Sequence, residues 1–99
     1  MAIYSKNHKN IRITEERANH ILTNHPEARE FFPQLSKIIS DPDIIFQGEA
    51  REFIAAKRRK NFHVVVVYKE EKEDGFVITA FRARSLKYLL KRKIIWKKE

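Results

Sequence analysis

Apolar residues recur at helical spacing through the first part of the chain. They follow Thr14, a good N-cap residue with two glutamates in the next turn, so we expect a helix over residues 15–23. Pro26 disfavours helical geometry at His25 and should end this helix there. A second helix is expected from Pro26 onward, because proline suits a first helical position. Pro33 should either kink that second helix or split it into a turn and a longer piece.

The pattern then changes to short runs of β-branched and aromatic residues with turn signals between them. The connections are short, which favours antiparallel neighbours. The run "FHVVVVY" is apolar on both faces and predicts a central strand that is covered on both sides. The expected strands cover residues 43–47, 52–57, 62–69 and 76–82.

Three shorter segments complete the prediction. Residues 11–14 read as either an edge strand or a lead-in to the first helix, Ser85 can cap a short helix at residues 86–90, and "KIIWKK" suits a final strand. The expected fold is α+β, with two N-terminal helices packed on a four- or five-stranded antiparallel meander and a short C-terminal helix and strand.

Composition fits one folded domain over residues 1–99, with residues 1–10 as a candidate flexible tail. Apolar residues make up 42% and charged residues 34% of the chain, which is the balance of a globular domain. Cysteine is absent, so disulfides and thiolate metal sites are excluded. The longest apolar run, residues 64–68, is too short to span a bilayer, and we expect a cytoplasmic protein without membrane contact.

The net charge of +8 is unevenly distributed. Residues 1–50 carry six Lys and Arg against seven Asp and Glu, whereas residues 51–99 carry fifteen against six. A basic half of this kind indicates a polyanionic partner, although surface lysines that only keep a small domain soluble would look similar. Aromatic residues interleave with the cations and can stack on unpaired bases. The candidate RNA-binding residues are Lys57, Arg58, Arg59, Lys60, Arg82, Arg84 and Lys91.

Four histidines are the groups suited to proton transfer near neutral pH. His25 follows the end of the first helix, where carbonyl groups favour the imidazolium form, so it is a candidate general acid or phosphate-binding cation. His20 lies mid-helix and reads equally well as a surface residue. The five-residue spacing of the pair does not suit zinc, and neither a metal nor a cofactor is expected.

Several reaction classes lack their sequence signals. Only two glycines occur, so a phosphate-cradling P-loop is not expected, and no carboxylate cluster or serine nucleophile elbow is present. A nuclease with this composition would work without a metal, which suits RNA because its 2′-hydroxyl can attack its own phosphate.

Several segments, taken in order, resemble a known family. These are "ITEERANHILTNHPE", "SDPDIIFQG", "REFIAAKR", "HVVVVYKEEKEDGFVITAFRA" and "KIIWKK". Together they resemble small bacterial and phage-associated members of the barnase–EndoU–colicin–RelE-like nuclease superfamily, across residues 13–97. The resemblance implies helices on an antiparallel sheet, with RNA cleavage on the open face of that sheet. It implies these catalytic positions: His25, His20, Arg51, Thr79 and Lys87.

The leading hypothesis is therefore a metal-independent, toxin-like endoribonuclease, with RNA as substrate and an acidic antitoxin or immunity protein as partner. One alternative is a non-catalytic module that binds RNA or DNA through the same basic half. Another is a basic structural domain that docks to an acidic protein.

Overall fold

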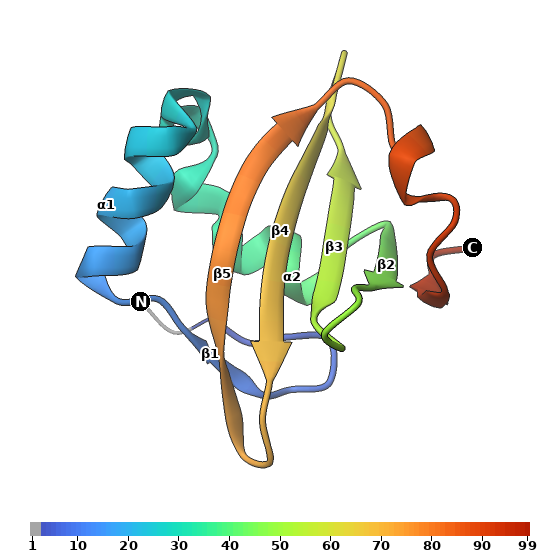
Figure 1. The fold of residues 1–99 in the computed structure, drawn as a ribbon, viewed down its shortest axis with the longest axis horizontal. Helices are drawn as coiled ribbons and strands as arrows, with labels where there is room; N and C mark the ends of the chain where they lie inside the picture. The colour runs from blue at the N-terminus through green and yellow to red at the C-terminus, as the bar shows by residue number, and fades with distance from the viewer. Residues whose placement is uncertain (1–2) are drawn as a thin grey trace.

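The computed structural model describes residues 3–99 and consists of one mixed sheet with its two α-helices on one face (Figure 1). The strand order is β1-β5-β4-β3-β2-β6. The strands are β1 (Asn10–Arg12), β2 (Ile44–Gln47), β3 (Phe53–Arg58), β4 (His63–Glu70), β5 (Asp74–Ala83) and β6 (Ile94–Lys97). The α+β class is confirmed, but the sheet has six strands rather than four or five.

The prediction of a purely antiparallel meander was wrong at one edge. β1 pairs with β5 in parallel, with Ile11 opposite Gly75. A parallel pair needs a long crossover, and here the helices and three strands lie between the two partners. A three-residue strand without a hairpin turn carries no local signal for such pairing. β6 closes the other edge by pairing antiparallel with β2.

The helices follow the capping and proline signals. α1 (Glu15–Asn24) begins after Thr14, whose Oγ1 accepts a hydrogen bond from the N–H of Arg17 at 3.1 Å. The second helical segment is split rather than kinked, because Pro33 falls in its middle. Its pieces are the 3-10 helices η1 (Pro26–Glu30) and η2 (Phe32–Gln34), and α2 (Leu35–Ser40). No helix within residues 3–99 is long and apolar enough to cross a membrane.

Two apolar clusters hold the sheet, one on each face. On the helix side, α1 and α2 pack against alternate residues of the central strands, including Val64 and Val66 of β4. On the second face, Val65 packs under Leu89 of η3 (Lys87–Leu89). Val64, Val65 and Val66 are fully buried, so β4 is the central strand that the sequence predicted. The second face is consequently not open across its middle, because Leu86 and Leu89 cover it.

The N-terminal segment from residue 3 is packed against the domain. Ile3 and Ser5 are buried, and the carbonyl of Ile3 accepts a hydrogen bond from the N–H of Ile11 at 2.7 Å. Within the candidate tail, Ile3 therefore belongs to the core, whereas most of residues 4–10 are exposed, and residues 1–2 lie outside the described range.

An ion cluster ties the α2–β2 connection to β3 and the C-terminus. The Lys57 ammonium lies 3.5 Å from Oδ2 of Asp41 and 3.9 Å from Oδ1 of Asp43, and it donates to the carbonyl of Asp41 at 2.7 Å. Lys98 Nζ is 3.2 Å from Oδ1 of Asp41. The Lys98 hydrogen bond and the charges of Lys57 and Lys98 lower the pKa of the Asp41 carboxyl.

Truncation of the central strand tests its double burial. Val65→Ala removes two buried methyl groups from the second cluster and should lower the free energy of unfolding by about 1–3 kcal/mol. Val67→Ala is the matched control, because Val67 lies on the same face but is only partly buried, so its loss should be smaller. Denaturant unfolding monitored by circular dichroism measures both, and equal values would contradict the assignment.

The ion cluster predicts a pH dependence. Asp41 has a lowered folded-state pKa, so its contribution is complete above the ordinary carboxyl pKa of about 4 and is lost as the pH falls through the folded-state value. Asp41→Asn should lower the Tm at pH 7, and its difference from wild type should shrink below pH ~4. Glu73→Gln, at an exposed carboxylate of the β4–β5 turn, is the control. A deficit that is constant from pH 7 to pH 3 would exclude this role.

Candidate nucleic-acid interface

His25 lies at the turn between α1 and η1, where Pro26 stops the helix. Its N–H donates to the carbonyl of Ile21 at 2.7 Å, and its carbonyl accepts from the N–H of Ala28 at 2.9 Å. The imidazole packs against the ring of Phe81 in β5, with centroids 5.6 Å apart and the planes tilted by 35°. His25, which belongs to the helical layer, thus contacts strand β5 of the sheet.

A carboxylate lies beside this imidazole. His25 Nδ1 is 3.7 Å from Oε2 of Glu27, and the two side chains are 36% and 26% exposed. The distance is too long for a hydrogen bond but short enough for attraction when the ring is protonated. Glu27 can therefore orient the ring of His25, which remains accessible to solvent.

Thr79 reaches the second face of the sheet because β5 contains a bulge. Val77 pairs with Tyr68 and Thr79 pairs with Val67, so Ile78 is left without an opposite residue. Val77 belongs to the helix-side cluster, whereas Phe81, two residues beyond Thr79, packs in the second cluster. In a regular strand residues 77 and 79 would share a face. The bulge thus turns Thr79 to the face where Phe81 contacts His25.

The neighbouring end of the sheet is strongly basic. Arg58 pairs with His63, which pairs with Ala83, so the β3–β4 turn and the end of β5 lie together. A cavity of about 320 Å³ opens there, lined by Asn61, Phe62, Arg82 and Arg84. This region, the basic hairpin end, holds five of the predicted RNA-binding residues: Arg58, Arg59, Lys60, Arg82 and Arg84.

Two of these arginines are anchored to the helical layer. Arg82 Nη1 lies 3.8 Å from Oε2 of Glu30, and its guanidinium is 5.3 Å from the centre of the Phe62 ring. Arg59 Nη2 donates to Oε1 of Gln34 at 2.9 Å. Both side chains are thereby oriented at the same end of the molecule as His25.

The remaining predicted residues are distributed over the domain. Lys87 is exposed in η3, which covers the second face on which Thr79 lies. Arg51 lies in the β2–β3 turn, at the opposite end of β3 from Arg58, with a left-handed φ of 64°. Lys57 is held in the ion cluster, with only 12% of its side chain exposed.

His20 does not join His25. Its Nε2 is 3.0 Å from Nδ2 of Asn24, and it lines a separate cavity of about 330 Å³ with Thr14, Glu16 and Arg17. Five positions along a helix place two side chains on different sides of it. Of the two histidines, His25 is the one whose ring packs on an aromatic ring of β5 in the described structure.

His63 is a candidate that the sequence prediction did not select. Its Nδ1 is buried without a hydrogen-bond partner in the described structure, next to the basic hairpin end. Its pairing with Ala83 places it on the second face of the sheet. The available signal was its position directly after a cationic turn, which is equally typical of a structural histidine.

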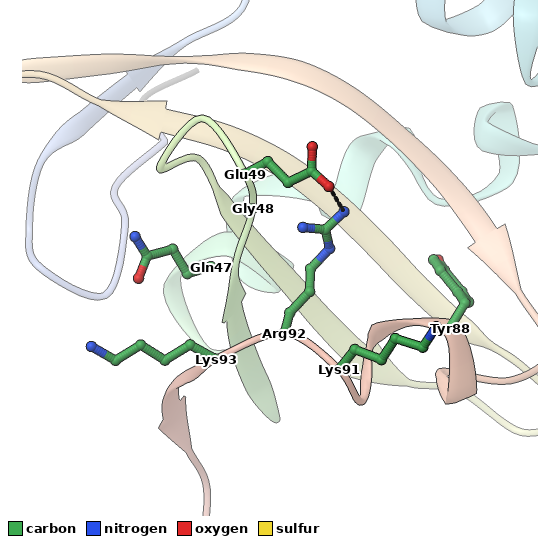
Figure 2. A pocket seen from close by; sticks show the side chains of 7 residues that line it. All are labelled: Gln47, Gly48, Glu49, Tyr88, Lys91, Arg92 and Lys93. Carbon is green, nitrogen blue, oxygen red and sulfur yellow. Dashed lines mark ion pairs between the residues drawn. The ribbon is translucent and has the colours of Figure 1, made fainter.

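A second basic cleft lies near the C-terminus (Figure 2). It has a volume of about 400 Å³ and lies between residues 47–49 and residues 88–93. Figure 2 shows Arg92 extended towards Glu49, with 3.9 Å between Nη2 and Oε1. Burial raises the pKa of the Tyr88 hydroxyl. Lys91 lines this cleft, across the sheet from His25.

The described residues contain no group of three or more His, Asp or Glu side chains arranged to hold a metal ion.

A profile of the family described as phage-Barnase-EndoU-ColicinE5/D-RelE like nuclease2 matches residues 2–97. This match confirms the superfamily resemblance that the sequence motifs indicated. Comparisons with curated proteins and with solved structures gave no match.

Proposed function

We propose that this chain, which belongs to the phage-Barnase-EndoU-ColicinE5/D-RelE like nuclease2 family, cleaves RNA without a metal ion. The observation that supports this most directly is the contact of the His25 imidazole with Phe81, beside the face that carries Thr79. A proton-transfer group and a hydroxyl group thus lie beside the second face of β5, and the basic hairpin end adjoins the end of that strand. These are the groups that intramolecular cleavage of RNA requires.

The proposed reaction is attack of the RNA 2′-hydroxyl oxygen on the adjacent phosphorus. A base removes the 2′-hydroxyl proton, the bond from phosphorus to the 5′ oxygen breaks, and an acid protonates that oxygen. The products carry a 2′,3′-cyclic phosphate and a 5′-hydroxyl. His25 serves as the base or the acid, with Glu27 orienting its ring. Lys87 is the second proton carrier in this scheme, because its segment covers the same face.

Thr79 and the arginines act on the phosphate in this proposal. The Thr79 hydroxyl donates a hydrogen bond to a non-bridging oxygen, and the guanidinium group of Arg84, which follows the end of β5, stabilises the charge that develops there. Arg82 pairs with Val64 and so faces the helix side, where it binds a neighbouring phosphate in this proposal. Phe62 offers an aromatic surface for a flanking base beside them. Arg51, His20 and Lys57 have no part in the reaction, because they lie in other regions or in internal ion pairs.

A toxin-like role in the cytoplasm completes the proposal. An unrestrained ribonuclease would damage the cell that makes it, and a chain with a net charge of +8 is suited to binding by an acidic inhibitor. We therefore propose an acidic antitoxin or immunity protein as the partner.

Cleavage of total RNA in the presence of EDTA tests the reaction. Wild-type protein should yield 2′,3′-cyclic phosphate ends, and His25→Ala should lower the rate by about 10²-fold or more. His20→Ala is the matched control and should retain wild-type activity, because that ring lies in a separate cavity. Equal activity of His25→Ala and wild type would exclude the proposed mechanism.

Binding to an uncleavable 2′-deoxy analogue separates recognition from chemistry. Arg84→Gln should weaken binding and reduce the slope of log K against log salt by about one unit. Lys72→Gln, in the β4–β5 turn away from the basic hairpin end, should leave the slope unchanged. Binding with the expected slope but without cleavage of RNA would instead favour a non-catalytic nucleic-acid-binding module.

A further inference from the structure

Exposed apolar side chains gather near the C-terminus. Leu90, Ile94 and Ile95 are 68%, 47% and 40% exposed, and Tyr88 is also exposed. Among the described residues, the one other large apolar side chain with such exposure is Tyr4. Small domains seldom leave neighbouring aliphatic side chains in water without a use, and such patches mark interaction sites.

Two of these side chains belong to an edge strand. β6 pairs with β2 alone, at the end of the strand order. Lys98 N–H donates to the carbonyl of Asp43 at 2.8 Å, whereas Lys97 occupies the next position, opposite Ile44. Backbone groups alternate sides along an antiparallel strand, so the N–H and carbonyl of Lys97 point away from β2. They are available to a further strand.

The same edge is cationic. Lys91, Lys93 and Lys97 have no ion-pair partner within residues 3–99, while Arg92 is 3.9 Å from Glu49. An added strand would therefore meet aliphatic side chains between positive charges. Carboxylates that alternate with aliphatic residues would complement this surface.

A hollow of about 390 Å³ lies beside β6. We call it the β6 groove, and it is lined by Gln47, Arg51, Phe53, Lys93, Ile94 and Ile95. Its walls combine apolar surface with a guanidinium and an ammonium group. An aliphatic side chain and a neighbouring carboxylate of a bound segment would fill it, which also gives Arg51 a role away from the reaction.

We propose that the free edge of β6 binds an extended, acidic and aliphatic segment of a partner protein by adding it as a further strand of the sheet. Backbone hydrogen bonds to Lys97 would hold the segment, and the β6 groove would select its apolar side chains. The proposal rests on the proposed function only for the idea of an acidic partner, and it requires no cleavage of RNA.

Two other occupants fit this edge less well. A second copy of the chain would bring another net charge of +8 to it, and the lysines and register shift of β6 discourage pairing between identical edges. RNA would satisfy the cations and can stack on Tyr88, but Leu90, Ile94 and Ile95 offer it neither stacking nor hydrogen bonds.

A short fluorescent peptide that alternates glutamate with valine serves as the probe for the full chain. It should bind, bind more weakly as salt rises, and slow hydrogen exchange at the Lys97 amide. Lys97→Pro should weaken binding about fivefold to tenfold more than Lys97→Gln, because both remove the charge but only proline removes the N–H. Proline is tolerated at an edge position whose N–H faces solvent.

Further variants keep the test decisive if Lys97→Pro fails to fold. Ile95→Thr retains strand propensity and should weaken binding, while Lys72→Gln, at an exposed residue of the β4–β5 turn, should not. A peptide that alternates lysine with valine should not bind. His25→Ala should bind the acidic peptide normally, which separates this proposal from the catalytic one.

Three results would overturn the proposal. The first is that the acidic peptide does not bind, or binds wild type and Ile95→Thr equally. The second is that an uncleavable RNA analogue protects the Lys97 amide and displaces the peptide. The third is that the free chain is a dimer by light scattering and Lys97→Pro makes it monomeric, since a second copy would then occupy the edge.

Discussion

The burial of β4 on both faces is the constraint on which the rest of the architecture depends. Val64 and Val66 need the helices on one side, and Val65 needs a second cover on the other. That second cover comes from η3, whose Leu89 packs over the middle of the sheet. Because the centre of both faces is used for stability, the parts of the sheet left for binding are its margins and ends.

The chemistry we propose depends on two local departures from regular structure. Pro26 ends α1 so that His25 can turn onto the ring of Phe81. The bulge in β5 reverses the facing of Thr79 relative to Val77, so the hydroxyl shares the face of that ring. In an unbroken helix and a regular strand, His25 and Thr79 would not reach the face that carries Phe81. Both departures remove regular backbone hydrogen bonds, and the burial of β4 offsets the stability that is lost.

Sequence reasoning was accurate where the signal is local. The Thr14 cap, the break at Pro26, an interruption at Pro33 and the central valine strand each follow from neighbouring residues. The parallel pairing of β1 with β5 joins segments far apart in the chain, and the sequence around β1 contains no local pattern that indicates it. The bulge was equally hidden, because one extra residue in a strand changes facing without changing composition.

The candidate site shows the same division. The run of four cations at residues 57–60 looks uniform, yet strand alternation turns Lys57 to the helix side and Arg58 to the other. Lys57 consequently forms ion pairs with Asp41 and Asp43, whereas its neighbours stay at the surface. The placement of Arg51 depends on tertiary geometry alone: it lies in the β2–β3 turn and lines the β6 groove, at the opposite end of β3 from Arg58.

The charge asymmetry of the chain becomes clearer once its ion pairs are followed. Within residues 3–99, five of the eight ion pairs join an acid from residues 1–50 to a base from residues 51–99: Asp41–Lys57, Asp43–Lys57, Asp41–Lys98, Glu30–Arg82 and Glu49–Arg92. Part of the basic excess is therefore balanced within the fold.

Two groups of neighbouring cations stay outside these pairs: Arg58, Arg59, Lys60 and Arg84 at the basic hairpin end, and Lys91, Lys93 and Lys97 near the edge of β6. Of these two surfaces, the second combines cations with exposed aliphatic side chains. Phosphates require charge alone, while a protein strand uses charge, backbone donors and apolar surface together. The difference in apolar content between the two surfaces is why we propose nucleic acid as the ligand of the first and a protein partner for the second.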